Sequence, residues 1–208
     1  LILGGYEYAS GSVPAAFRWL LALGGHSGSK ARGVELVQDA MMHGKRASTA
    51  ALALLAVAYG REKMFVYSRE MYQHLARFFP RNYLYEMEIA GTYQREGNLG
   101  AAVVVSKNIA RKHEAGAAGY DRVDATKLYF QIATLLEEHK RPDDAMEFFQ
   151  KVILQRPEAA LHGHSYLRLG EYYRARNERE KARAMYEKAR HLPFPEIQKQ
   201  AARGLRKL

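Results

Sequence analysis

The side chains of this sequence that could do chemistry are histidines, paired carboxylates and a glycine-rich segment. His162 and His164 stand two residues apart, so they fall on different faces of a helix. His113-Glu114 lacks the second histidine that a zinc-binding helix needs. The chain has no cysteine, which excludes disulfides, thiolate ligands and a cysteine nucleophile. We therefore expect neither a metal site nor a cofactor.

Two further segments match catalytic or phosphate-binding motifs only in part. Residues 24–30 are rich in glycine, but a P-loop needs Gly-Lys followed by Ser or Thr after a strand. Here Ser29 precedes the lysine and Ala31 follows it, so the segment predicts a turn between helices. Asp143 and Asp144 follow a proline, where carboxylates are typical caps of a helix N-terminus. With no nucleophile beside a base, the sequence indicates a protein that is not an enzyme.

The positive charge of the chain gathers near its C-terminus. Residues 166–208 hold 12 Lys/Arg and 5 Asp/Glu, a net charge of +7 out of +10 for all 208 residues. An anionic partner, nucleic acid above all, would bind there first. The candidates are Arg174, Arg176, Arg179, Lys181, Arg183, Lys188, Arg190, Lys199, Arg203, Arg206 and Lys207. Several alternate with glutamates, which is also typical of ion-paired helix faces, so both interpretations stay open.

Bulky and small residues recur at fixed spacings. Three pairs of bulky residues are separated by thirteen positions, and a small residue stands nine positions after the first member of each. The pairs are Tyr59 and Tyr72, Leu136 and Phe149, and Tyr173 and Tyr186, with Ser68, Ala145 and Ala182 between them. A small side chain lets two antiparallel helices approach closely, and the later ring fills the space beneath the next pair. Pro80 and Pro157 then end the second helix.

In this pattern the sequence resembles the tetratricopeptide repeat family, in its bacterial form. Four repeats stand in register, at 49–82, 83–116, 126–159 and 163–196, with a lengthened loop at 113–123. The second repeat departs from the family pattern at Ser106, where an aromatic residue is expected. The resemblance implies an all-α fold, an α–α superhelix in which antiparallel helix hairpins form a solenoid.

The ends of the chain depart from the repeat. Residues 1–47 predict a degenerate helical hairpin or repeat, with helical patterns over 14–24 and 30–43. Tyr6 and Tyr8 are expected to pack on this hairpin as the end of a preceding helix.

At the other end, residues 196–208 predict an amphipathic capping helix that closes the repeats of 48–195 into one continuous solenoid. The chain begins at Leu1 without Met, so we expect its N-terminus to be missing. The longest apolar stretch is about half the length of a membrane span. We expect a soluble fragment, cytoplasmic or exported, whose compartment stays open.

In the family, the first helix of each repeat lines a concave groove that commonly binds extended peptides. By register, the groove candidates are Arg61, Gln94, Arg95, Lys127, Thr134, Glu137, Glu138, His164, Glu171 and Arg174. Some relatives clamp a peptide carboxylate with Asn at positions that here hold Val57, Gly91, Thr134 and Glu171, which argues against that clamp. The candidates either contact a partner or form a solvated face. The resemblance implies a non-catalytic scaffold for a protein or peptide of unknown identity, and nucleic-acid binding is the alternative.

Overall fold

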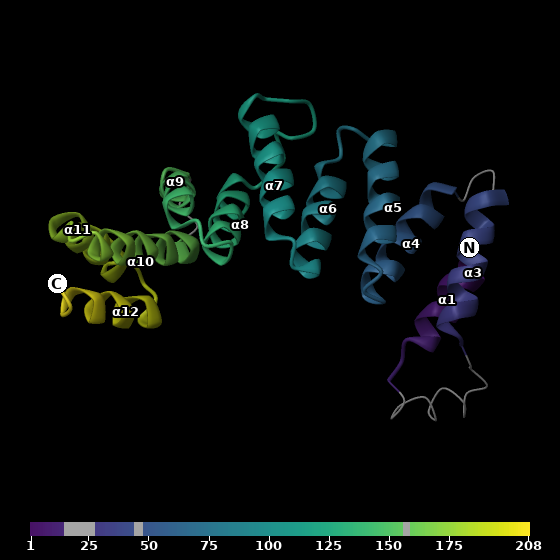
Figure 1. Cartoon of the computed structure of the whole chain (residues 1–208), viewed down its shortest axis with the longest axis horizontal. Helices are drawn as coiled ribbons and strands as arrows, with labels where there is room; N and C mark the ends of the chain where they lie inside the picture. Colours follow the sequence, from purple (N-terminus) through teal and green to yellow (C-terminus); the bar gives the residue numbers. More distant parts are fainter. Residues whose placement is uncertain (15–27, 44–47, 156–158) are drawn as a thin grey trace. The chain divides into compact units, whose positions relative to one another are not determined.

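The computed structural model describes residues 1–14, 28–43, 48–155 and 159–208. These residues form α-helices joined by turns, with no β-strand among them (Figure 1), and the predicted all-α fold is confirmed. The chain divides into two compact units, Leu1–Gly97 (unit 1) and Asn98–Leu208 (unit 2). Within the described residues, no helix combines the length and apolar character needed to cross a membrane.

Each unit contains a series of helices, several consecutive pairs of which pack together as hairpins. Unit 1 contains α1 (Ile2–Gly11), α3 (Lys30–His43), α4 (Ser48–Arg61), α5 (Phe65–Phe78) and α6 (Tyr83–Glu96). Unit 2 contains α7 (Leu99–Glu114), α8 (Ala125–Glu138), α9 (Pro142–Ile153), α10 (Ala159–Ala175), α11 (Arg179–Arg190) and α12 (Pro195–Leu205). Helices α4 and α5 pack together in unit 1, and in unit 2 α8 packs on α9 and α10 on α11.

Left-handed residues close the hairpins α4–α5, α8–α9 and α10–α11. They are Lys63 (φ 61°), Lys140 (φ 58°) and Asn177 (φ 60°). Each is the fifteenth residue of its predicted repeat. The N–H of the next residue donates to the carbonyl five residues back, at 2.8, 2.8 and 2.9 Å, and so satisfies the end of the first helix. The turn geometry therefore recurs with the period of the sequence.

The small and bulky residues of the repeat form the interior, as predicted. Ser68 and Ala182 are 0% exposed and Ala145 is 1% exposed. Tyr59, Tyr72, Leu136, Phe149 and Tyr186 are buried as well, whereas Tyr173 is only partly buried. Ser68 also donates a 2.7 Å hydrogen bond from Oγ to the carbonyl of Ala56 across the α4–α5 hairpin. A small residue at this position thus permits close approach and, in one case, adds a bond.

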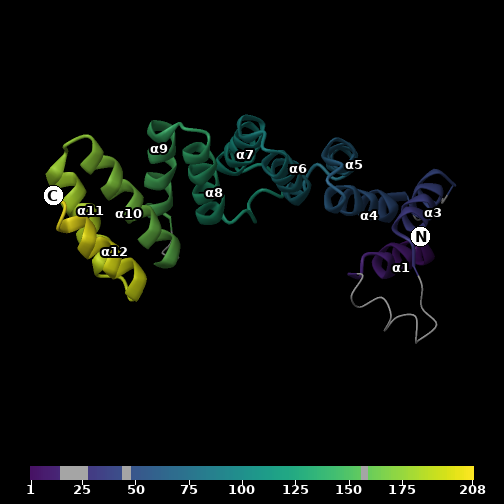
Figure 2. The same ribbon diagram turned by 60° about the horizontal axis from the view of Figure 1, so that its bottom comes forward.

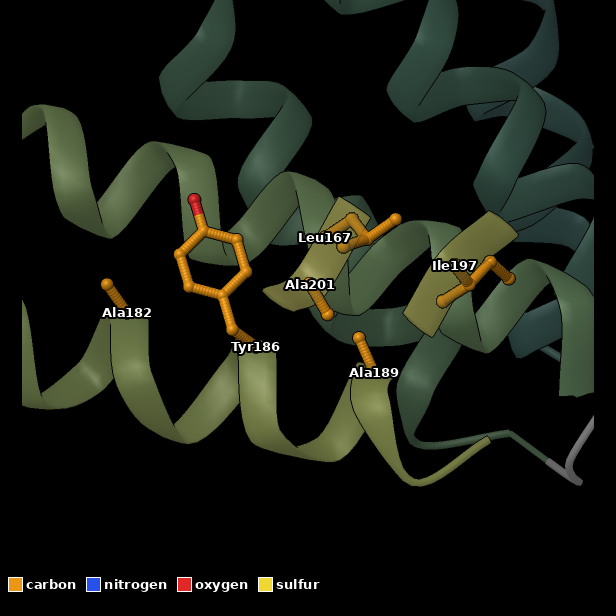
Figure 3. Close-up of a cluster of buried hydrophobic side chains, with 6 residues drawn as sticks. All are labelled: Leu167, Ala182, Tyr186, Ala189, Ile197 and Ala201. Atoms are coloured by element: carbon orange, nitrogen blue, oxygen red, sulfur yellow. The ribbon is translucent and has the colours of Figure 1, made fainter. Parts of the chain in front are cut away.

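The C-terminal cluster shows this packing in detail (Figure 3). Side chains from α10, α11 and α12 point toward one another there: Leu167, Ala182, Tyr186, Ala189, Ile197 and Ala201. The ring of Tyr186 lies against Gly170 and Gly204, where an added Cβ would come within 2.6 and 2.5 Å of it. Helix α12 therefore covers the last hairpin through a contact that leaves no room for a larger residue.

At the N-terminus, α1 packs against α3 (Figure 2), and Tyr8 is buried there as expected, whereas Tyr6, which was also expected to pack, is 41% exposed. A Cβ on Gly33 would lie 2.4 Å from the backbone nitrogen of Tyr8, so the two helices touch along a glycine. The phenol of Tyr8 donates to Glu62 at 3.1 Å, and Lys30 Nζ lies 2.8 Å from the same carboxylate. The helix predicted over residues 14–24 lies, beyond Pro14, outside the described residues.

A second cluster of Tyr, Glu and Lys connects three helices of unit 2. Tyr129 donates to Glu114 at 2.9 Å, and Lys151 Nζ lies 3.0 Å from that carboxylate. Burial, the hydrogen bond and the negative charge of Glu114 raise the pKa of Tyr129 well above its ordinary value, and the bond from Lys151 lowers the pKa of Glu114. The loop after α7 packs beside this cluster through Tyr120, which is 3% exposed.

Candidate functional site

Two predicted groove residues, Arg61 on α4 and Arg95 on α6, meet in one pocket of unit 1. The pocket has a volume of about 370 Å³. We call it the arginine pocket, and it is lined by Ala56, Val57, Gly60, Arg61, Tyr72, Glu88 and Arg95. The two arginines are 34 residues apart, one repeat period, so they occupy the same position of consecutive first helices.

The arginine pocket carries positive charge that is only partly compensated. Arg95 Nη2 lies 3.9 Å from Glu88 Oε2, and both side chains are 49% exposed. An ion pair this long and this exposed contributes little to stability. Among the described residues, Arg61 has no ion-pair partner. A carboxylate entering the pocket would therefore meet two guanidinium groups and one competing acid.

Glycines make room for the arginine side chain in this pocket. An added Cβ would lie 3.8 Å from Arg95 Nη2 if placed on Gly60, and 3.6 Å from Nη1 if placed on Gly91. The guanidinium group therefore lies over both glycines.

Tyr72 lines the same pocket. Burial raises the pKa of Tyr72 to about 12; the negative charge of Glu88 adds to this increase and the positive charge of Arg95 opposes it. The phenol is therefore neutral at physiological pH.

An apolar cavity adjoins the arginine pocket on the other side of α4. Its volume is about 200 Å³. The apolar cavity is lined by Gly5, Tyr8, Ala9, Gly33, Val34, Val37, Leu54, Leu55, Val57, Ala58 and Arg61. Val57 and Arg61 line both recesses. Leu54 and Val57 remain 42% and 43% exposed.

Unit 2 holds a second pocket, which brings Glu137 of α8 and Glu171 of α10 together. We call it the mixed-charge pocket, and its volume is about 390 Å³. It is lined by Glu137, Pro142, Asp143, Met146, Phe149, Arg168, Leu169, Glu171, Tyr172, Ala175 and Arg176. The sequence predicted only its two glutamates as groove residues, because Arg168 and Tyr172 gave no signal beyond ordinary helix positions.

The charges of the mixed-charge pocket are largely matched within it. Arg168 lies between two carboxylates, 3.5 Å from Glu137 and 3.0 Å from Glu171. Asp143 accepts hydrogen bonds of 2.5 Å from Tyr172 and from Arg176. Burial raises the pKa of Glu137, an effect that Arg168 opposes and Glu171 reinforces.

The prediction that Asp143 and Asp144 cap a helix is wrong. The N-cap of α9 is Arg141, with no side-chain cap hydrogen bond, and the two aspartates lie in the first turn. Pro142 occupies the start of the helix, which suits its fixed φ and missing N–H, and this moves the aspartates inside. Asp144 pairs with Arg141 at 2.5 Å. Both carboxylates still face the positive end of the helix dipole.

The other predicted groove residues line neither of these pockets. They are Gln94, Lys127, Thr134, Glu138, His164 and Arg174. Lys127 pairs with Asp124, the N-cap of its own helix, at 3.0 Å. Thr134 Oγ1 donates to the carbonyl of Gln131 at 2.9 Å. Both side chains are therefore engaged within or at the end of their own helix.

The C-terminal basic residues divide into paired and unpaired groups. Five of the eleven predicted basic residues form ion pairs: Arg176–Asp143, Lys181–Glu178, Arg183–Glu180, Arg190–Glu187 and Lys199–Glu196. Lys188 lies 5.6 Å from the ring centre of Tyr166. Arg179, Arg203, Arg206 and Lys207 are exposed and have no ion pair among the described residues. The pairs of Arg183 and Lys199 are 3.8 and 4.0 Å long and exposed, so they compete only weakly with an anionic partner.

The described part of the chain contains no group of three or more His, Asp or Glu residues that could hold a metal ion. His113 Nδ1 lies 2.7 Å from the carbonyl of Tyr120 in the loop after α7.

Comparisons with known proteins place this fold among helical repeats. The family model of the tetratricopeptide repeat matches residues 127–159 and 164–195, within one residue of two predicted repeats. The solved structure of MamA MSR-1 C2 is 16% identical with a TM-score of 0.51, covering 82% of this chain and 88% of that one. A Podosopora anserina structure of kinesin light chain TPR-like repeats is 16% identical with a TM-score of 0.53, covering 96% and 98%. At these identities the likeness shows the fold alone. No curated protein sequence matches the chain.

Proposed function

We propose that the chain is a non-catalytic scaffold that binds a protein or peptide along the first helices of its repeats. The match of residues 127–159 and 164–195 to the tetratricopeptide repeat model supports a role in protein interaction in general. The observation that carries the groove assignment is the arginine pocket, where Arg61 and Arg95 line one recess.

Three properties of the arginine pocket support this function. It lies across the first helices of two consecutive repeats, so an extended segment can contact both. Its arginines are exposed and weakly paired, so a partner's carboxylate displaces no strong internal bond. Guanidinium groups bind carboxylates through two parallel hydrogen bonds, which adds direction to the attraction.

The test is selection from a displayed library of random twelve-residue peptides on the full chain. Peptides enriched on the wild-type protein should be lost from Arg95→Glu and Arg61→Glu, because a carboxylate in the pocket would repel them. Arg81→Glu is the matched control, since Arg81 is exposed in unit 1 and does not line the pocket. Circular dichroism of each variant checks that it folds.

Two outcomes would contradict the proposal. Absence of any enriched peptide would remove peptide binding as the function. Enrichment that survives both pocket substitutions would remove the arginine pocket as its site.

Nucleic-acid binding is the second candidate, and the observation in its favour is the unpaired set of Arg179, Arg203, Arg206 and Lys207. Four phosphate contacts would give a slope of about −3.6 for log affinity against log salt on duplex DNA. Fluorescence anisotropy with a labelled 20-base-pair duplex, from low to physiological salt, measures that slope. No binding at low salt removes this candidate.

A further inference from the structure

The apolar cavity of unit 1 is held open by glycines and fixed by hydrogen bonds. Gly5 has no side chain, so the wall of the cavity at this position is formed by the backbone of α1. A Cβ added to Gly5 would lie 3.8 Å from Leu54 Cδ1, at ordinary contact distance. About one turn further along the same helix, the phenol of Tyr8 donates a hydrogen bond of 3.1 Å to Glu62. The carboxylate of Glu62 is in turn bound by Lys30 at 2.8 Å. The cavity is therefore built from three helices whose relative positions within unit 1 are fixed.

Its size suits one apolar side chain. A cavity of about 150 Å³ lined by aliphatic residues holds a benzene-sized molecule, and this one measures about 200 Å³. Its lining is aliphatic, except for the tyrosine wall and Arg61. Exposed Leu54 and Val57 would lose contact with water if a side chain entered.

The apolar cavity and the arginine pocket are close enough to take one short segment. Val57 and Arg61 line both, so the two recesses share part of their wall. An extended peptide rises about 3.3 Å per residue, so a few residues are enough to reach both recesses. Arg95 lines the arginine pocket together with Arg61, with Glu88 as the competing acid.

We propose that unit 1 recognises a partner segment that carries a branched apolar side chain and, within a few residues of it, a carboxylate. The apolar side chain occupies the apolar cavity, and the carboxylate lies between Arg61 and Arg95. This inference rests on the proposed function and adds to it the chemistry of the partner.

Three synthetic peptides test this pairing, each blocked at both ends and labelled with fluorescein. The probe is Gly-Ser-Leu-Ser-Glu-Glu-Ser-Gly. One control replaces its leucine by serine and the other replaces both glutamates by glutamine. Fluorescence anisotropy on the full chain should show affinity falling about tenfold for each control, because each loses one of the two contacts.

Variants of the protein should remove the preference for leucine and the preference for the glutamates separately. Ala9 is exposed and lines the cavity, so Ala9→Phe blocks the mouth without displacing a buried side chain, and it should abolish the preference for leucine. Arg61→Glu should abolish the preference for the glutamates. Ala50→Phe and Arg81→Glu are the matched controls, since neither residue lines either recess.

Equal affinity for the three peptides, or no binding of the probe, would overturn the pairing. The library selection separates this failure from that of the proposed function. If the selected peptides depend on Arg95 but lack the pair of an apolar and an acidic residue, the proposed scaffold function is supported and the proposed partner chemistry is contradicted. If no peptide is selected at all, the proposed function itself is contradicted.

Discussion

The arginine pocket of unit 1 and the mixed-charge pocket of unit 2 lie between helices of the same repeat type, yet their charges are arranged differently. In unit 1 the thirteenth position of two repeats holds Arg61 and Arg95, opposed by one distant acid. In unit 2 the same position holds Glu138 and Ala175, and the charges of the pocket pair with one another. One scaffold can therefore leave its groove charges available to a partner or use them to stabilise the fold.

The largest expected difference in stability between the two regions comes from substituting a glycine in each. A Cβ on Gly204 would lie 2.5 Å from the ring of Tyr186, whereas one on Gly91 would meet only the flexible end of Arg95 at 3.6 Å. We expect Gly204→Ala to lower the free energy of unfolding by about 1–3 kcal/mol through overpacking. Gly91→Ala should be neutral or stabilising by up to about 1 kcal/mol, because alanine favours the helix. Urea denaturation measures both, and equal stabilities would contradict the packing described for α12.

Charge reversal should have opposite consequences in the two pockets. Arg168→Glu would replace two ion pairs by three carboxylates with Glu137 and Glu171, so we expect a loss of roughly 0.5–1 kcal/mol in the free energy of unfolding, because these side chains are partly exposed. Arg95→Glu should change stability by less than about 0.5 kcal/mol, since its ion pair is long and exposed. It should nevertheless lose peptide binding.

Both variants should be measured by urea denaturation and by peptide binding. Peptide binding lost from Arg168→Glu while the protein remains folded would show that the mixed-charge pocket also serves the partner. The contrast between the two regions would then be wrong.

The interior of the repeat was predictable from sequence because it depends on residue size at fixed spacing. Ser68, Ala145 and Ala182 were identified in this way, and Arg61 and Arg95 followed from their common register. The left-handed turns could not be predicted from this register, because lysine is not a residue type that indicates a φ near +60°.

Pairing across helices was beyond the sequence for a different reason. Whether Arg168 reaches Glu137, Glu171 or solvent depends on rotamers and on the angle between α8 and α10. The apolar cavity was missed because the glycines of α1 and α3 read as weak helix formers rather than as a close contact. Patterns of size are therefore easier to read from sequence than patterns of charge.

The Tyr–Glu–Lys clusters give each unit a pH-dependent contact that can be compared. The hydrogen bond from Lys30 lowers the pKa of Glu62 below its ordinary 4.5, and Lys151 does the same for Glu114. Stability from a lowered carboxyl pKa is present above pH 4.5 and is lost as pH falls through the folded-state value. Glu62→Gln and Glu114→Gln should each lose about 0.5 kcal/mol at pH 7, after allowance for solvent screening. Denaturation at pH 7 and pH 3 should show each loss shrinking in acid, and a loss that is unchanged at pH 3 would rule out the linkage.

Glu137 should behave in the opposite sense, with the smallest effect. Burial raises its pKa above 4.5, so the folded state holds the proton more tightly than the unfolded state. Folding is then penalised as pH rises through the window between 4.5 and the folded-state value, and the penalty persists above it. Glu137→Gln removes this penalty but also one partner of Arg168, which keeps Glu171 at 3.0 Å. We expect a gain of roughly 0.3 kcal/mol at pH 7 that disappears at pH 4, because a third of this side chain is exposed. A loss of stability at pH 7 would mean that the pair with Arg168 outweighs burial, and the mixed-charge pocket would then depend on Glu137 for its stability.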